Sequence, residues 1–124
     1  LWDDARTYRE PSLLGGWFAA PPQEGRRNFE RQYRDVFGRP PPRVATLAYD
    51  AVALAAVLAR DKGPEGADFS PTVLTNPAGF AGLEGIFRLT PQGQVERGFA
   101  VFEVQRGAAR VLSPAPDTFE TPQN

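Results

Sequence analysis

One long apolar stretch, Arg43–Arg60, constrains the fold of this chain more than any other part of the sequence. Between Val44 and Ala59 nearly every residue is Ala, Leu or Val, and polar side chains are rare. Ala and Leu are strong helix formers, so the stretch predicts a helix. It is shorter than the roughly 20 apolar residues that cross a bilayer. A helix that is apolar on nearly every side needs layers of structure around it, and we therefore expect this one to be buried.

Shorter elements are predicted before the long helix. The polar segment Leu1–Glu10 shows no periodicity and is expected to be a connecting loop. An apolar run bounded by glycines and prolines predicts a strand near Gly16–Ala20. Over Gln23–Phe37 the apolar residues recur with helical spacing, which predicts an amphipathic helix ended by Gly38.

The segment after the long helix is expected to be mainly β-structure. Turn-forming residues at 61–68 predict a surface loop, and Ser70-Pro71 has the pattern of an N-cap and first helical residue, so a short helix should run to about Thr75. The glycine-rich segment 79–85 is expected to be irregular. Residues 113–124 should form an extended tail. Strands are predicted at 86–89, 99–104 and 110–112, with the first two joined through the turn-forming residues 91–94 and the second covered on both faces.

Composition narrows the classes of function. The chain has 124 residues, enough for one domain, and its net charge of −1 gives no overall attraction for nucleic acid or anionic lipid. It contains no His and no Cys, which are common general bases, nucleophiles and metal ligands, so we expect no enzyme activity, no metal and no cofactor. It also has no Met and begins at Leu1, from which we expect it to be a piece of a longer protein.

Two clusters of side chains are candidates for binding. An arginine cluster on the helix predicted at 23–37 offers contacts to phosphate or to an acidic partner, although Glu30 and Asp35 lie among its members and a solvated helix face is the simpler interpretation. The aromatic pair Trp17-Phe18 precedes a proline corner and is placed to line a cleft, with core packing as the alternative for at least one ring. The arginine cluster consists of Arg26, Arg27, Arg31 and Arg34.

Several motifs resemble those of one protein family. They are G-G-W-F-A-A-P at 15–21, F-x-x-x-Y-x-x-x-F-G-R-x-P at 29–41, A-Y-D-A-V-A-L at 48–54, and the segment 80–104 with its spaced glycines and final strand. Together they are similar to the C-terminal part of type I periplasmic solute-binding proteins, the group that includes leucine/isoleucine/valine-binding proteins. W-F-A-A-P, L-A-Y-D-A-V-A-L and L-T-N-P-A-G-F-A-G most resemble the bacterial lipoproteins called penicillin-binding protein activators.

The resemblance implies an α/β fold. The chain would be the C-terminal segment of a two-lobed protein, with a parallel sheet flanked by helices and a terminal hairpin-like region. Residues 1–16 would end the second lobe, 17–97 would return to the first lobe, and 98–124 would cross back. Ligands of open α/β sheets bind at the carboxyl ends of strands, so the resemblance points to four residues near the hinge and the interlobe cleft. These candidate ligand-cleft residues are Trp17, Phe18, Ala20 and Val44.

Two functions follow from the resemblance. The first is a periplasmic receptor that captures a small solute, with amino acids as one class, between its lobes and delivers it to an ABC transporter. The second is an envelope lipoprotein, periplasmic or in the outer membrane, that binds and regulates a penicillin-binding protein, a peptidoglycan synthase. In either case the resemblance implies a location in the bacterial envelope, no nucleic-acid partner, and membrane contact only through a lipid anchor outside this chain.

Overall fold

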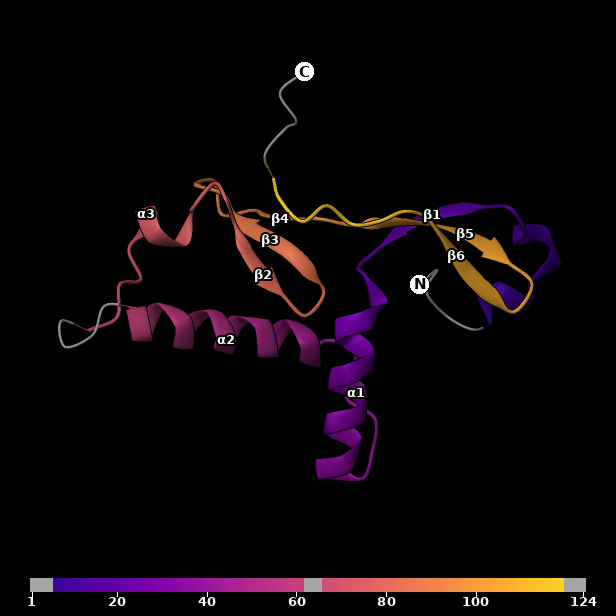
Figure 1. Ribbon diagram of the computed structural model, residues 1–124, viewed down its shortest axis with the longest axis horizontal. Helices are drawn as coiled ribbons and strands as arrows, with labels where there is room; N and C mark the ends of the chain where they lie inside the picture. Colours follow the sequence, from indigo (N-terminus) through magenta and orange to yellow (C-terminus); the bar gives the residue numbers. More distant parts are fainter. Residues whose placement is uncertain (1–5, 62–65, 120–124) are drawn as a thin grey trace, which may run out of the picture.

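The computed structural model describes residues 6–61 and 66–119, so the predictions made for 1–5, 62–65 and 120–124 lie outside the described residues. Figure 1 shows an elongated arrangement, with the sheet β1–β5–β6 at one end, the long helix α2 and the strands β2, β3 and β4 at the other, and α1 between them. The helices are α1 (Gln23–Phe37), α2 (Ala45–Asp61) and α3 (Pro71–Leu74). The strands are β1 (Trp17–Ala20), β2 (Phe80–Gly82), β3 (Gly85–Leu89), β4 (Val95–Arg97), β5 (Ala100–Gln105) and β6 (Ala108–Ser113).

A hydrophobic cluster lies on one face of the sheet β1–β5–β6, while Leu58, Ile86 and Phe87 are buried elsewhere. Phe18 of β1 pairs in register with Phe102 of β5, and their rings stack with centroids 5.3 Å apart. Tyr8 covers Phe18 from the short 3-10 helix η1 (Thr7–Arg9), which is followed by a second one, η2 (Pro11–Leu13). Because side chains alternate between the faces of a strand, one row of residues is buried. The buried cluster consists of Tyr8, Phe18, Ala20, Ala100, Phe102 and Val104.

The helices begin and end where the local sequence predicts. α1 spans the same residues as its prediction, and Gly38 ends it with a φ of 66° while its N–H donates to the Arg34 carbonyl at 2.8 Å. This left-handed conformation suits glycine because it has no Cβ. β1 and α3 also confirm their predictions, with Ser70 before Pro71 at the start of α3. The sequence predicts a loop over Leu1–Glu10, but the described part of this segment contains η1.

The second sheet is packed against α2 through the tight turn between β2 and β3. Asp50 of α2 is only 4% exposed, and its Oδ1 accepts a hydrogen bond from the Leu83 N–H at 2.8 Å. Thr46, one turn earlier on the same helix, donates from Oγ1 to Glu84 Oε1 at 2.9 Å. Two polar residues of the apolar stretch, Thr46 and Asp50, are therefore buried because they bond to the hairpin.

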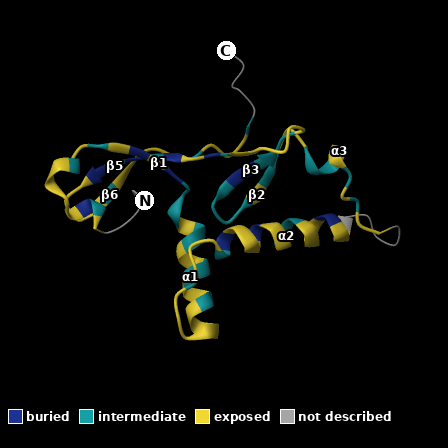
Figure 2. Ribbon diagram, turned by 180° about the vertical axis from the view of Figure 1, so that it is seen from behind, coloured by how far each residue is buried: buried dark blue, intermediate teal, exposed yellow. Residues whose placement is uncertain are grey.

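The structure corrects the expectation that α2 is buried on nearly every side. One face, which includes Thr46, Asp50 and Leu58, is buried, while Val52 on the far side is 70% exposed. Figure 2 shows α2 exposed over much of its length, with buried positions only at intervals. The reason is that the described residues cover this helix with the β2–β3 hairpin and, at Tyr49, with the Phe29 ring of α1 at a centroid distance of 5.5 Å, and leave its outer face uncovered. The exposed outer face consists of Ala48, Ala51, Val52, Ala55, Ala56 and Ala59.

The strand pairing also differs from expectation. β3 pairs with β2 and β4, both missed from the sequence, whereas β5 pairs with β1 and β6. The turn at 91–94 therefore does not lead directly from β3 into β5, because β4 follows it and pairs with β3. β5 is buried on one face rather than both. Each pairing between described strands is antiparallel, so the parallel sheet implied by the resemblance is not formed within this part of the chain.

Candidate functional site

A groove with two compartments runs between the first turns of α1 and the core face of the sheet β1–β5–β6. The compartments have volumes of about 270 Å³ and 360 Å³, and Gln23 and Arg27 line both. Each is close in size to the smaller pockets that hold organic ligands in proteins. We treat this groove as the candidate site.

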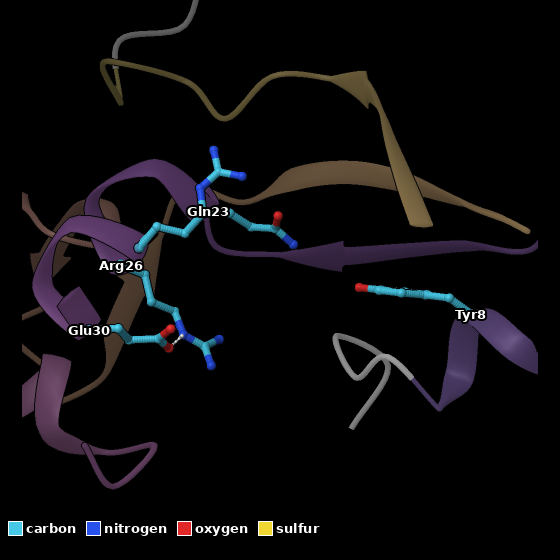
Figure 3. Close-up of a pocket in the computed structure, with 5 residues that line it drawn as sticks. Tyr8, Gln23, Arg26 and Glu30 are labelled. Carbon is cyan, nitrogen blue, oxygen red and sulfur yellow. Dashed lines mark hydrogen bonds and ion pairs between the residues drawn. The ribbon is translucent and has the colours of Figure 1, made fainter. Parts of the chain in front are cut away.

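The first compartment is polar. Figure 3 shows the Tyr8 side chain reaching from η1 toward α1 with its hydroxyl foremost, and the Gln23 amide extending toward it across the space. Arg26 and Glu30 lie one turn apart on α1 and form the ion pair drawn in the same view, with Arg26 Nε 2.8 Å from Glu30 Oε1. The compartment is therefore lined by hydroxyl, amide, carboxylate and guanidinium groups from two segments of the chain.

The second compartment is mostly apolar. Phe102 and Ala100 of β5 contribute core-face side chains, and Val111 of β6 adds an exposed one. Glu24 is the acidic residue on this compartment, and it is exposed at the first turn of α1. An apolar compartment joined to a polar one is the usual construction of a site for a small amphiphilic molecule. The remaining lining comes from Pro22, Ala109, Pro114 and Ala115.

The structure separates the four cleft residues indicated by the resemblance. Phe18 and Ala20 point into the core beneath the groove, whereas Trp17 lies on the opposite face of β1 and is 71% exposed. Val44 lies just before α2 and is 66% exposed. Trp17 and Val44 are thus accessible at the surface, whereas Phe18 and Ala20 are buried on the core face of the sheet.

The groove includes residues that the sequence did not single out together. Sequence patterns predict a loop around Tyr8 and a solvated helix face for Arg26 and Arg27. The aromatic ring of Tyr8 in a mostly polar segment could have indicated that this residue packs against another part of the chain, since aromatic rings are usually buried at least in part.

Beside Trp17, a carboxylate on β5 carries a shifted pKa. Gln105 and Arg110 donate hydrogen bonds to Glu103 Oε2 at 3.2 Å and 3.0 Å. These two bonds, Gln105 first, hold the pKa of Glu103 below its ordinary value of 4.5, and the positive charge of Arg110 and a bond from Trp17 act in the same direction. Glu103 is therefore ionised on the Trp17 face of the sheet at neutral pH.

Residues 6–61 and 66–119 contain neither a candidate metal site nor a candidate membrane-spanning helix. No group of three or more acidic residues there could hold a metal ion. Within the same ranges, none of the helices has both the length and the apolar character needed to span a bilayer.

Comparison with known proteins gives one informative likeness. A solved structure from Rhodospirillum rubrum, assigned to a branched-chain amino acid ABC transporter, superposes with a TM-score of 0.67 at 25% sequence identity. The likeness covers 82% of this chain but only 32% of that chain. No protein-family model matches the sequence, and no curated protein is similar to it.

The class of fold follows from this likeness and from the arrangement of helices and sheets. The chain has the α/β fold of a segment of a periplasmic-binding protein. It spans about a third of the length of the solved chain that it matches.

Proposed function

We propose that this chain is the C-terminal segment of a two-lobed receptor of the bacterial envelope that captures a small solute between its lobes. The observation that carries the proposal is the fold match over 82% of this chain to one third of a longer solved protein. That solved protein is assigned to branched-chain amino acid transport. We extend this assignment to amino acids as the first solutes to test and to an ABC transporter as the partner that receives them.

The layout of the sheet β1–β5–β6 supports a hinge at this point. β1 continues through Pro21 into α1, and β5 follows Gly98, so two neighbouring strands connect the same two halves of the molecule. Neighbouring connections of this kind allow two bodies to rotate as a hinge. In the proposed receptor, residues 1–16 belong to the second lobe, 17–97 to the first, and 98–124 cross back.

The outer face of α2 supports a longer protein. The outer face of α2 consists of alanines and Val52, which is 70% exposed, so it forms no hydrogen bonds with water through its side chains. Small side chains of this kind allow another layer of the protein to pack closely against the helix. In the proposed receptor that layer belongs to the remainder of the first lobe. Trp17 and Val44 are our candidates for direct contact with the captured solute, and Phe18 and Ala20 hold the crossing strand that carries Trp17.

A thermal-shift screen of the full-length receptor tests this function. Binding to the folded state at one hundred times the dissociation constant adds about 2.7 kcal/mol of stability, so a true ligand raises Tm measurably. Amino acids and other small metabolites form the panel. If no compound of the panel raises Tm at saturating concentration and a pull-down captures a class A penicillin-binding protein, the proposed receptor function is wrong. The alternative, a lipoprotein that regulates a peptidoglycan synthase, would then take its place.

A further inference from the structure

The tail that follows β6, residues 114–119, joins the two sheets of the molecule a second time. Ala115 packs against the hydrophobic cluster of the sheet β1–β5–β6. Phe119 reaches the other sheet, where its ring lies against Gly79, the residue before β2. Figure 1 shows the tail leaving β6 and running back toward β2, β3 and β4. The chain therefore crosses from β4 to β5 through Gly98 and then returns along the tail.

Two glycines allow the tail to lie directly on the backbone. A Cβ at Gly98, between β4 and β5, would come within 2.9 Å of Pro116 Cγ. A Cβ at Gly79 would come within 2.9 Å of the Phe119 ring. Real Cβ atoms do not approach other carbon atoms so closely, so a larger residue at either position would displace the tail. The tail thus has one contact at the connection between the sheets and another beyond it.

Arg88 of β3 holds the far end of the tail. Its guanidinium carbon lies 4.5 Å from the centre of the Phe119 ring, which is the geometry of a cation–π interaction. Arg88 Nε donates to Glu96 Oε2 at 2.6 Å, and Arg88 Nη1 donates to the Pro77 carbonyl at 3.1 Å. These two bonds restrict the guanidinium group, so the Phe119 ring packs on a side chain that is already oriented.

We propose that residues 114–119 form a strap across the hinge of the receptor and hold its lobes in the arrangement of this structure. The inference rests on the proposed two-lobed function, in which the two sheets belong to different lobes. The four residue steps from Ala115 to Phe119 span at most about 14 Å. Rotation of the lobes that moves these two anchors further apart must release Phe119 from Arg88.

The strap regulates how easily the lobes rotate. A contact that exists in only one arrangement favours that arrangement by its own free energy, whichever solute the lobes capture. Loss of a weak cation–π contact corresponds to a roughly threefold change in the ratio of the two arrangements.

Distances between two spin labels on the ligand-free full-length protein test the strap. Arg106→Cys, in the turn between β5 and β6, and Arg60→Cys, near the end of α2, place one exposed label on each side of the hinge. We expect Phe119→Ala to raise the share of molecules outside the main distance roughly threefold. An unchanged distance distribution would overturn the proposal. If Phe119→Ala does not fold, Phe119→Leu gives the same test, because it keeps an apolar side chain and removes the ring.

Two further variants assign the effect to the contact between Phe119 and Arg88. Thr118→Ala is the matched control, because Thr118 is the exposed neighbour of Phe119, and it should leave the distribution unchanged. Arg88→Gln should broaden the distribution as Phe119→Ala does, and the double variant should add nothing, since both changes remove one contact. Equal broadening by Thr118→Ala, or additive broadening in the double variant, would contradict this assignment.

The outcomes separate the strap from solute capture. Broadening by Phe119→Ala in a protein whose Tm no compound of the panel raises would keep the strap and remove the solute. A Tm raised by leucine, together with an unchanged distance distribution in Phe119→Ala, would keep the receptor and remove the strap.

Discussion

The carboxylate of Asp50 holds the backbone of Leu83, with 2.8 Å between Asp50 Oδ1 and the Leu83 nitrogen. Oδ2 of the same carboxylate is buried and has no hydrogen-bond partner among the described residues. It lies against Gly82, where a Cβ would come within 2.5 Å of it. One helix residue thus fixes the turn of the β2–β3 hairpin and requires glycine beside it, which explains why a polar residue occurs in the middle of the apolar stretch.

Removing the Asp50 carboxylate should destabilise the protein. Asp50→Ala leaves the Leu83 N–H without its acceptor in a buried place, at a cost of about 1–3 kcal/mol. Asp50→Asn keeps a carbonyl oxygen that accepts the same bond and should cost less. Urea unfolding of the two variants measures the difference. Equal and negligible losses would show that the hydrogen bond does not hold the hairpin.

Gly25→Ala should destabilise the protein, although Ala is favoured over Gly by about 1 kcal/mol inside an exposed helix. Gly25 lies near the start of α1, and a Cβ there would overlap the carbonyl oxygen of Leu83. Because the obstacle is backbone, relief requires α1 to move away from the hairpin, at a cost of about 1–3 kcal/mol. Gln32→Ala on the exposed side of α1 is the control and should be nearly neutral in urea unfolding. A stabilising Gly25→Ala would refute the close contact.

The outer face of α2 gives a test that depends on the size of the protein. In the 124-residue chain, Val52→Glu should change the unfolding free energy by less than about 0.5 kcal/mol, because Val52 is 70% exposed. In the full-length receptor we expect this face to be covered, and the same change should cost roughly 2 kcal/mol or more by burying an unpaired charge. Chemical denaturation of both proteins makes the comparison.

Two controls accompany the α2 experiment. Arg60→Glu, near the end of the same helix and exposed, should be neutral in both proteins. Leu58→Ala, at a buried position, should cost about 2 kcal/mol or more in both. If Val52→Glu is neutral in the full-length protein as well, the proposed covering layer does not exist.

Lowering the pH should weaken the hydrogen bond that Glu103 of β5 accepts from Arg110 of β6. The pKa of this carboxyl is lowered in the folded protein, first by the Gln105 amide and then by Arg110. A carboxyl with a lowered folded pKa contributes stability above its unfolded value near 4.5 and loses that stability as pH falls through the folded pKa.

Relative to Glu103→Gln, the unmodified protein should therefore be more stable at pH 7, and the difference should shrink below about pH 4.5. Thermal unfolding of both proteins at a series of pH values between about 3 and 7 measures it. A difference that stays constant over this range would exclude the ionised Glu103 as its source.

Local sequence was sufficient for the elements whose ends depend on neighbouring residues. Gly38 ends α1 and Ser70-Pro71 starts α3 because caps and glycine or proline geometry act within a few residues. The apolar, β-branched and aromatic run at 99–104 likewise marks a strand before any partner is known, although it does not show which face is buried. The α/β fold class was predicted from the family resemblance, because hydrophobic periodicity indicates single helices and strands but not how they are arranged.

Tertiary structure decided what these elements contact. Composition showed that α2 is apolar, but only the arrangement showed which face the hairpin covers and that Asp50 is the buried anchor. The pairing of β5 with β1, and the groove that joins Tyr8 to Arg27, bring together residues distant in the chain. Local preferences fix backbone conformation at low cost, whereas such contacts depend on which distant surfaces bury the most apolar area and satisfy the most hydrogen bonds, and that choice is made only when the chain packs.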